Sequence, residues 1–285
     1  MGRAARAAPA AGDPDMEVVR PEFLPDPDRS HEEMEALQRE IAATASFEDD
    51  FDFDVADIEL DESPTDAPTA AGSVGEQVTL TDSDAPVVVG VDQAFVGDDY
   101  SVSAAVAIRD GRVVERAAGR AELEVPYIPG LLAFREGDAI VDALESLSVE
   151  PDVLVLDGSG RIHFRQAGLA THVGVLFDVP AVGVAKNLLC GTPREPLDEP
   201  LPEGARVAIE ADDSMDAPEG TVVGYAYQSR QYPNPEKRHV NPLIVSPGHR
   251  VSAETTVDVV EATCTGYKLP APTRLADAYA DDLKD

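Results

Sequence analysis

Several residue types are scarce in this chain of 285 residues. Tryptophan is absent, and the two cysteines, Cys190 and Cys264, are too few for a disulfide framework. No apolar run approaches the roughly 20 residues of a membrane-spanning helix, and residues 1–11 lack the apolar segment of a secretion signal. We therefore expect a cytoplasmic protein with no membrane partner.

Positive charge is also scarce. The chain has 22 basic and 55 acidic residues, a formal net charge of −33, and lysine occurs at four positions only. A nucleic-acid partner normally requires a basic surface, so the charge alone argues against one. At about 1 M salt, however, the Debye length falls to about 3 Å. We interpret the charge as a halophilic adaptation to salt, under which an acidic surface stays hydrated without excluding DNA.

The acidic excess is spread over two regions of different character. Residues 1–85 contain five bases and 23 acids, for a net charge of −18. We predict that they form an acidic, largely disordered extension. Within it, residues 30–44 are expected to form a helix, because Ser30 and Glu33 match the capping-box pattern. Residues 86–285 are expected to form a single folded domain.

The order of the elements expected after residue 85 predicts the fold class. A first strand at 86–91 precedes strands at 101–108 and 112–123, which the hairpin turn Asp110-Gly111 joins. A helix is expected at 132–147, followed by alternating segments. Strands are expected at 152–156, 181–184, 206–210, 221–228 and 243–245, and helices at 168–177, 253–264 and 273–283. This order predicts an α/β protein with a ribonuclease-H-like mixed sheet flanked by helices.

Three acidic residues stand where they could meet. Asp92 and Asp157 each end an apolar strand, and Glu136 shares a helical stripe with apolar residues. Taken singly, each aspartate could cap a turn, and Glu136 could pair with Arg135. If the two strands are neighbours, the three carboxylates converge at one sheet edge, where hard oxygen ligands suit Mg²⁺ or Mn²⁺. Such a site activates water and stabilises a phosphate under attack.

Other residues are weaker candidates. His249, in a predicted turn after a strand, could donate to a phosphate or position water, and Lys186 could contact a phosphate or pair with a site acid. Tyr127, held between two prolines, could wedge between stacked bases. In each case an ordinary structural role is an alternative.

Two more candidates follow the Asp157 turn. His163 and Arg165 could contact phosphate or base. His172 and Cys264 share helical faces with apolar residues, so we expect both in the core.

The motifs taken in order resemble the endonuclease V family over roughly residues 86–280. They are Gly-Val-Asp at 90–92, Pro-Tyr-Ile-Pro-Gly at 126–130, Phe-Arg-Glu-Gly at 134–137, Asp-Gly-Ser-Gly at 157–160, Gly-Val-Ala-Lys at 183–186, Ser-Pro-Gly-His at 246–249, Gly-Tyr-Lys-Leu-Pro at 266–270 and Thr-Arg-Leu-Ala-Asp at 273–277. The chain departs from the family at Phe95, Ser159 and Phe164, which bears on substrate preference more than on the metal site.

The resemblance implies a function. It implies Mg²⁺-dependent cleavage of one strand at the second phosphodiester bond 3′ to deoxyinosine, leaving 3′-hydroxyl and 5′-phosphate ends, in DNA repair. Asp92, Glu136 and Asp157 would hold the metal, and His249 would assist the water or the phosphate. The base-reading loop would consist of Tyr127 framed by Ile128 and Pro129, and Gly160 would help line the pocket for the extruded base.

Alternatives remain open at the level of the sequence. The substrate could be inosine-containing RNA, or the chain could bind such nucleic acid without cleaving it, although all three expected ligands are present. Residues 1–85 could dock a basic partner protein. We expect a monomer with no obligate protein partner.

Overall fold

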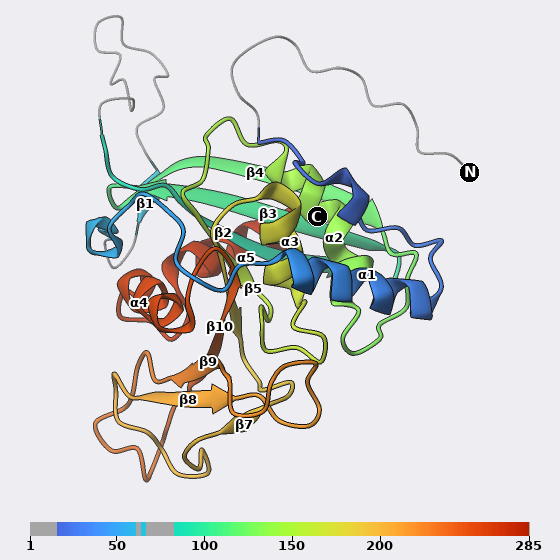
Figure 1. Ribbon diagram of the computed structural model, residues 1–285. Coiled ribbons are helices and arrows are strands. Elements are labelled where there is room, and N and C mark those ends of the chain that lie inside the picture. Colours follow the sequence, from blue (N-terminus) through green and yellow to red (C-terminus); the bar gives the residue numbers. More distant parts are fainter. Residues whose placement is uncertain (1–15, 61–63, 67–82, 285) are drawn as a thin grey trace, which may run out of the picture.

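The computed structural model describes residues 16–60, 64–66 and 83–284. Its centre is a ten-stranded sheet with the order β1-β4-β3-β2-β5-β6-β10-β9-β8-β7 (Figure 1). The strands are β1 (Thr65–Asp66), β2 (Val88–Val96), β3 (Tyr100–Arg109), β4 (Arg112–Glu122), β5 (Val153–Asp157), β6 (Ala181–Ala185), β7 (Thr192–Pro193), β8 (Arg206–Glu210), β9 (Val222–Tyr227) and β10 (Leu243–His249).

Strand direction confirms the predicted ribonuclease-H-like arrangement. Strands β2, β3 and β4 form an antiparallel meander, and β5 and β6 continue the sheet parallel to β2. The predicted hairpin joins β3 to β4 through Asp110 and Gly111, which have φ values of 49° and 68°. Such positive values suit a tight two-residue turn. Strand β10 then joins β6 in the antiparallel direction, which carries the rest of the sheet away from the parallel centre.

Helices cover both faces of the sheet (Figure 1). On one face, α2 and α3 pack on the strands and α1 lies against α3. On the other face, α4 and α5 pack directly on the strands. The alternation of side chains along β2 serves both layers, because Val89 and Val91 join the α2–α3 core while Val88 faces the α4 core. The helices are α1 (His31–Thr44), α2 (Leu132–Leu144), α3 (Leu169–Phe177), α4 (Ala253–Thr263) and α5 (Ala271–Asp282), with short 3₁₀ turns η1 (Pro21–Phe23) and η2 (Val55–Asp57).

Two strands run further than the sequence predicts. Strand β2 was expected to end before Asp92 but continues to Val96, because β3 pairs with it along its whole length. Parallel pairing with β5 ends at Val91, so Asp92 stands where the neighbouring strand stops. Strand β10 was expected to end at Val245 but continues to His249, with an irregular register between Pro247 and His249 that accommodates the proline.

Residues 16–60 pack against the sheet domain, which contradicts their predicted disorder. The predicted helix is present as α1, and its capping box is formed, since the Ser30 backbone N–H donates to Glu33 at 2.7 Å and the Glu33 N–H donates to the Ser30 hydroxyl. The apolar face of α1 is buried in the α2–α3 core. The segment after α1 also packs, because Phe51 and Phe53 stack at 4.4 Å beside the α4 core.

The contradiction has a physical cause. Acidic composition suggests disorder only where too little apolar surface can be buried, and this segment buries Met16, Phe23 and Ile41. Its acids also form contacts with the sheet domain, since Asp49 accepts hydrogen bonds from Ser252 at the start of α4. The remainder of the predicted disorder lies outside the described residues. In the described part of the chain, no helix has the length and apolar character needed to cross a bilayer.

A core substitution in α1 tests this packing. Ile41→Ala removes a fully buried side chain and is expected to lower the free energy of unfolding by about 3 kcal/mol. Glu40→Ala, at an exposed position of the same helix, should change it by less than about 0.5 kcal/mol. Urea unfolding at constant high salt measures both. Equal, negligible effects would mean that α1 does not pack in solution.

Candidate nuclease site

A cleft of about 480 Å³ opens where the parallel strands β2, β5 and β6 end. Its walls come from elements far apart in the sequence: these strand ends, the start of α2, the loop at 126–130, α1 and α5. Most of the predicted site residues line it. They are Asp92, Tyr127, Ile128, Pro129, Glu136, Asp157, His163 and Lys186.

The strand register brings two of the carboxylates together. Val91 pairs with Leu156 across β2 and β5, so the next residues, Asp92 and Asp157, stand side by side at the cleft. Asp92 is only 6% exposed, and its carboxylate accepts a hydrogen bond from the neighbouring Gln93 N–H at 2.7 Å. Burial, followed by repulsion from Asp157, raises the pKa of Asp92 to about 8. A buried carboxylate without a cationic partner is costly unless something neutralises it.

Glu136 approaches from α2. Its carboxylate lies on the predicted apolar stripe with Ile140 and Leu144 and is 5% exposed. Within the described residues it makes no hydrogen bond or ion pair. The alternative partner, Arg135, instead donates to the Val125 carbonyl at 2.7 Å and lies over the Phe95 ring. Burial raises the pKa of Glu136 to about 7, and Asp157 adds to the rise.

Lys186 contributes positive charge to the cleft. Its Nζ lies 3.0 Å from Oδ2 of Asp157, so the predicted pairing with a site acid is present. This hydrogen bond and the attraction of Asp157 raise the pKa of Lys186 above its usual value. Because Lys186 is mostly exposed, the ion pair is screened by solvent. It can therefore open and turn toward a phosphate.

Asp277 is a fourth carboxylate at the cleft that sequence reasoning did not single out. It lies on α5 and is close enough to Asp92 to contribute to the raised pKa of that group. The close approach of α5 to β2 places it there, because a Cβ on Gly90 would come within 2.1 Å of the Pro272 backbone. The signal was present in the Thr-Arg-Leu-Ala-Asp motif, which ends at this residue.

The carboxylates fit a hydrated divalent cation better than a preformed cage. In the described residues, no three His, Cys, Asp or Glu side chains are grouped closely enough to hold an ion. Asp157 lies near enough to both Asp92 and Glu136 for its charge to raise the pKa of each. Mg²⁺ keeps several waters and often takes only one or two protein carboxylates together with substrate phosphate. The buried, unpaired acids are suitable donors for such an ion.

The loop at 126–130 forms an exposed edge of the cleft. Tyr127 is 68% exposed, and Phe95 and Leu189, also exposed, line the same cleft. His163 contacts the end of the loop, because its Nε2 lies 2.9 Å from the Gly130 carbonyl oxygen. Its Nδ1 accepts a hydrogen bond from the Arg165 N–H, which fixes the orientation of the ring. Burial lowers the pKa of His163 to about 4, so the ring is neutral. His163 therefore positions the loop, and both of its nitrogens are occupied.

Two residues that were predicted to contact nucleic acid, Gly160 and Arg165, do not line the cleft. Gly160 lies against β10, where its N–H donates to the Ser246 hydroxyl at 2.9 Å and an added Cβ would meet the Pro247 carbonyl. Its neighbours Gly158 and Ser159 line the cleft instead. Arg165 is 9% exposed and pairs with Glu35 of α1 at 2.8 Å. Its guanidinium therefore binds side chains of α1.

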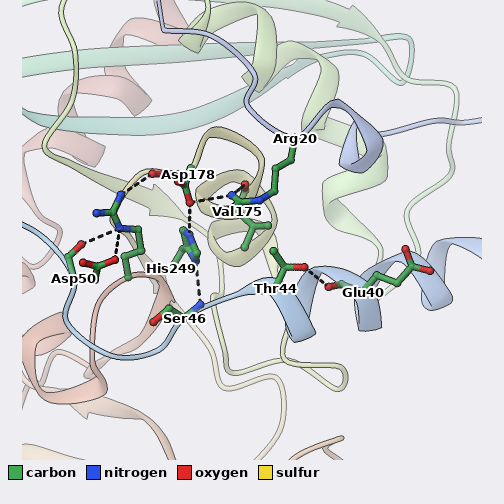
Figure 2. A network of polar contacts seen from close by, with 9 residues as sticks. Arg20, Glu40, Thr44, Ser46, Asp50, Val175, Asp178 and His249 are labelled. Carbon is green, nitrogen blue, oxygen red and sulfur yellow. Dashed lines mark hydrogen bonds and ion pairs between the residues drawn. The ribbon is translucent and has the colours of Figure 1, made fainter.

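His249 lies at the opposite edge of the sheet, which contradicts its predicted catalytic role. Its register partner is Ala181 at the beginning of β6, whereas Lys186 follows the end of that strand. The ring nitrogens lie 3.1 Å from the Ser46 N–H and 3.0 Å from Oδ1 of Asp178, to which Arg20 also donates (Figure 2). The predicted turn is in fact an antiparallel strand, which carries His249 away from the cleft. His249 thus fastens residues 16–60 to the domain.

Of the two residues expected in the core, His172 is fully buried and Cys264 is only partly buried. His172 is 1% exposed, and its Nε2 lies 2.6 Å from the Phe23 carbonyl. Burial lowers its pKa to about 4. Cys264 packs half-buried beside the α4 core, and neither Cys264 nor Cys190 is in a disulfide.

The sheet order and the carboxylates at its edge define a protein of ribonuclease-H-like fold with an acidic cleft. The family model described as endonuclease V matches residues 72–278. The chain therefore belongs to the endonuclease V family, whose members are nucleases and are generally metal-dependent.

Relatives and solved structures agree with this assignment. The chain is 69% identical to an endonuclease V of Halobacterium salinarum over 94% of this chain and all of that one. It is 59% identical to one of Haloarcula marismortui over 93% and 97%. The crystal structure of the human endonuclease V catalytic domain superposes with a TM-score of 0.66 at 27% identity, covering 90% of this chain and 97% of that one.

One structural neighbour was solved with nucleic acid. The Ciona intestinalis endonuclease V has a TM-score of 0.63 and 22% identity, covering 88% of this chain and 96% of that one. That structure is a complex with a 24mer DNA containing an inosine followed by a ribo-adenosine.

The buried acids predict a pH dependence of stability in the metal-free protein. Because the folded pKa of Asp92 is raised from 3.8 to about 8, its ionisation disfavours the folded state. The free energy of unfolding should therefore fall as pH rises from about 4 to about 8. Asp92→Asn should remove part of this fall, so that the variant becomes more stable than wild type at high pH but not at low pH.

Urea unfolding with a chelator at several pH values measures the effect. Glu219→Gln, which removes one exposed charge that does not line the cleft, is the matched control and should follow the wild-type curve. A constant difference between Asp92→Asn and wild type at all pH values would refute a raised pKa.

Proposed function

We propose that this protein is a metal-dependent endonuclease that nicks DNA at the second phosphodiester bond 3′ to deoxyinosine, in the repair of deaminated adenine. One observation carries the proposal: a single cleft holds Asp92, Glu136 and Asp157 next to the exposed loop of Tyr127. A phosphate-cleaving group and a base-reading group are thus within reach of one nucleotide. Residues 86–285 would be the catalytic domain.

Asp92, Asp157 and Glu136 would supply the protein ligands of Mg²⁺, with Mn²⁺ as a substitute. Because the three side chains are not grouped closely enough to hold an ion by themselves, water and the substrate phosphate would complete the site. The ion would supply a more acidic bound water and charge stabilisation for the phosphate under attack. The chain itself contributes the rest. Burial of Asp92 and Glu136 raises the pKa of both carboxyls, so each would give up a proton in order to act as a ligand. Lys186 would move from Asp157 to the phosphate as the substrate enters.

The base would be read outside the helix. A base edge buried in a duplex cannot be inspected in place, so enzymes acting on a base extrude it. The exposed ring of Tyr127 would fill the gap left in the stack, and Ile128 and Pro129 would frame it. Inosine-containing DNA in the Ciona intestinalis complex supports this choice of ligand.

Cleavage of labelled strands with one inosine, in DNA and in RNA, tests the proposal directly. With Mg²⁺ at high salt, we expect a nick one nucleotide beyond the inosine on the DNA strand. Preference for the RNA strand would make the protein an inosine-specific ribonuclease. Binding without a nick on either strand, from folded protein, would leave a non-catalytic inosine-binding protein.

The metal ligands can be tested by substitution in the same assay. Asp92→Ala and Asp157→Ala should each abolish cleavage, because each removes a donor that the cation needs. Circular dichroism should show both variants folded, and Glu219→Gln should cleave like wild type. Full activity in either alanine variant would reject the metal-site assignment.

The role of Tyr127 makes a separate prediction. Tyr127→Ala should weaken binding to an inosine strand by about tenfold, since stacking of a base on an aromatic ring contributes about 1–3 kcal/mol. Tyr127→Phe keeps the ring and should bind like wild type. Fluorescence anisotropy with labelled strands measures both affinities. Unchanged affinity in the alanine variant would exclude the wedge, and equal losses in both variants would assign the effect to the hydroxyl.

A further inference from the structure

The Tyr127 loop is held at its end by a residue from outside the sheet domain. The Gly130 carbonyl accepts two hydrogen bonds, one from Gln38 Nε2 at 2.7 Å and one from His163 Nε2 at 2.9 Å. Gln38 lies on α1, ninety-two positions earlier in the chain. Gly130 has φ of +84°, which favours glycine at this point of the loop. The loop therefore ends at a fixed backbone position.

The amide of Gln38 can face only one way. Its Oε1 accepts from Arg165 Nε at 2.7 Å, and a guanidinium can only donate. Its Nε2 faces the carbonyls of Gly130 and, at 3.4 Å, Ala167, and a carbonyl can only accept. Turning the amide over would lose all three contacts. The side chain is 1% exposed, so water cannot replace them.

The helix that carries Gln38 is itself fixed. Its apolar face, with Met34, Leu37 and Ile41, is buried in the α2–α3 core. Arg165 links Gln38 to Glu35 one turn earlier through its 2.8 Å ion pair. Gln38 also lines the cleft itself. The position of α1 is thus transmitted to the loop through one buried amide.

The rest of the loop has few restraints. Arg135 holds its beginning through the Val125 carbonyl, and the Leu131 N–H donates to the Ile128 carbonyl within it. Between these points Tyr127 is 68% exposed. The direction in which Tyr127 points therefore depends on how the two ends are anchored.

We propose that Gln38 is a positioning residue for recognition of the base, and that α1, which carries it, belongs to the nuclease site. The inference rests on the function proposed above. Gln38 acts through the Gly130 backbone and fixes the loop that carries Tyr127. Residues 16–60 thereby set the geometry of the cleft from outside the catalytic domain.

The main test is Gln38→Glu, which keeps the size and the acceptor facing Arg165 but removes the N–H donors. Hydrogen exchange of the amides of Tyr127, Ile128, Gly130 and Leu131 should become faster. Arg39→Ala is the matched control, because Arg39 ties the same helix to Asp216 and does not contact the loop. It should leave these amides unchanged. Unaltered loop exchange in folded Gln38→Glu would overturn the proposal.

A double-mutant cycle connects the loop to the substrate. Gln38→Glu alone should reduce single-turnover cleavage of the inosine strand by about tenfold, whereas in the Tyr127→Ala background it should cost less than about twofold. Equal losses in both backgrounds would mean that Gln38 supports folding only, and would overturn the proposal. If Gln38→Glu does not fold, Gln38→Met, which is similar in volume and makes no hydrogen bond, replaces it.

The two proposals can fail separately. Wild-type protein that cleaves no inosine strand refutes the nuclease function, and with it the use of the loop. Exchange of the four loop amides would then still show whether Gln38 holds the loop. Wild-type cleavage combined with additive effects in the cycle refutes the role of Gln38 alone.

Discussion

The site depends on carboxylates that are buried before anything is bound to neutralise them. Asp92 stands where parallel pairing with β5 ends, and Glu136 faces inward from α2, so neither is solvated. Folding alone gives these groups no adequate partner, because Lys186 pairs with Asp157 and Arg135 is turned to Val125. The remaining electrostatic cost can be offset by a proton or by a cation. If a cation binds there, the same burial that raises the pKa of Asp92 and Glu136 would couple its binding to proton release.

Polar contacts hold residues 16–60 to the sheet domain at several separate places, of which two involve His249 and Gln38. At one edge of the sheet, His249 and Asp178 bind Ser46 and Arg20. At the cleft, Gln38 binds the Gly130 carbonyl. Apolar packing of α1 lies between these polar contacts. A segment attached in this way moves with the domain, so its position can affect the loop that it contacts.

Sequence reasoning succeeded where a local pattern determines the structure. The alternation of strands and helices correctly predicted a mixed sheet flanked by helices, and the stripe containing Glu136 correctly predicted an inward-facing carboxylate. It failed where the outcome depends on distant packing. Asp277 reaches the cleft because α5 packs on Gly90, and no local pattern shows that approach. His249 was predicted to lie in a turn. Pairing with β6 instead continues strand β10 as far as His249, which therefore lies at the opposite end of these strands from the cleft.

The net charge of −33 and a polyanionic substrate place opposite demands on the same surface. Within the described lining of the cleft, Lys186 faces four acids, Asp92, Glu136, Asp157 and Asp277. Long-range attraction cannot bring DNA to such a cleft, and at low salt the field of the whole protein would repel it. High salt removes the repulsion beyond about 3 Å and leaves contacts at short range. Under the proposed function, binding would then rest on a cation shared between the acids and the phosphate and on stacking by Tyr127, both of which act only at short range.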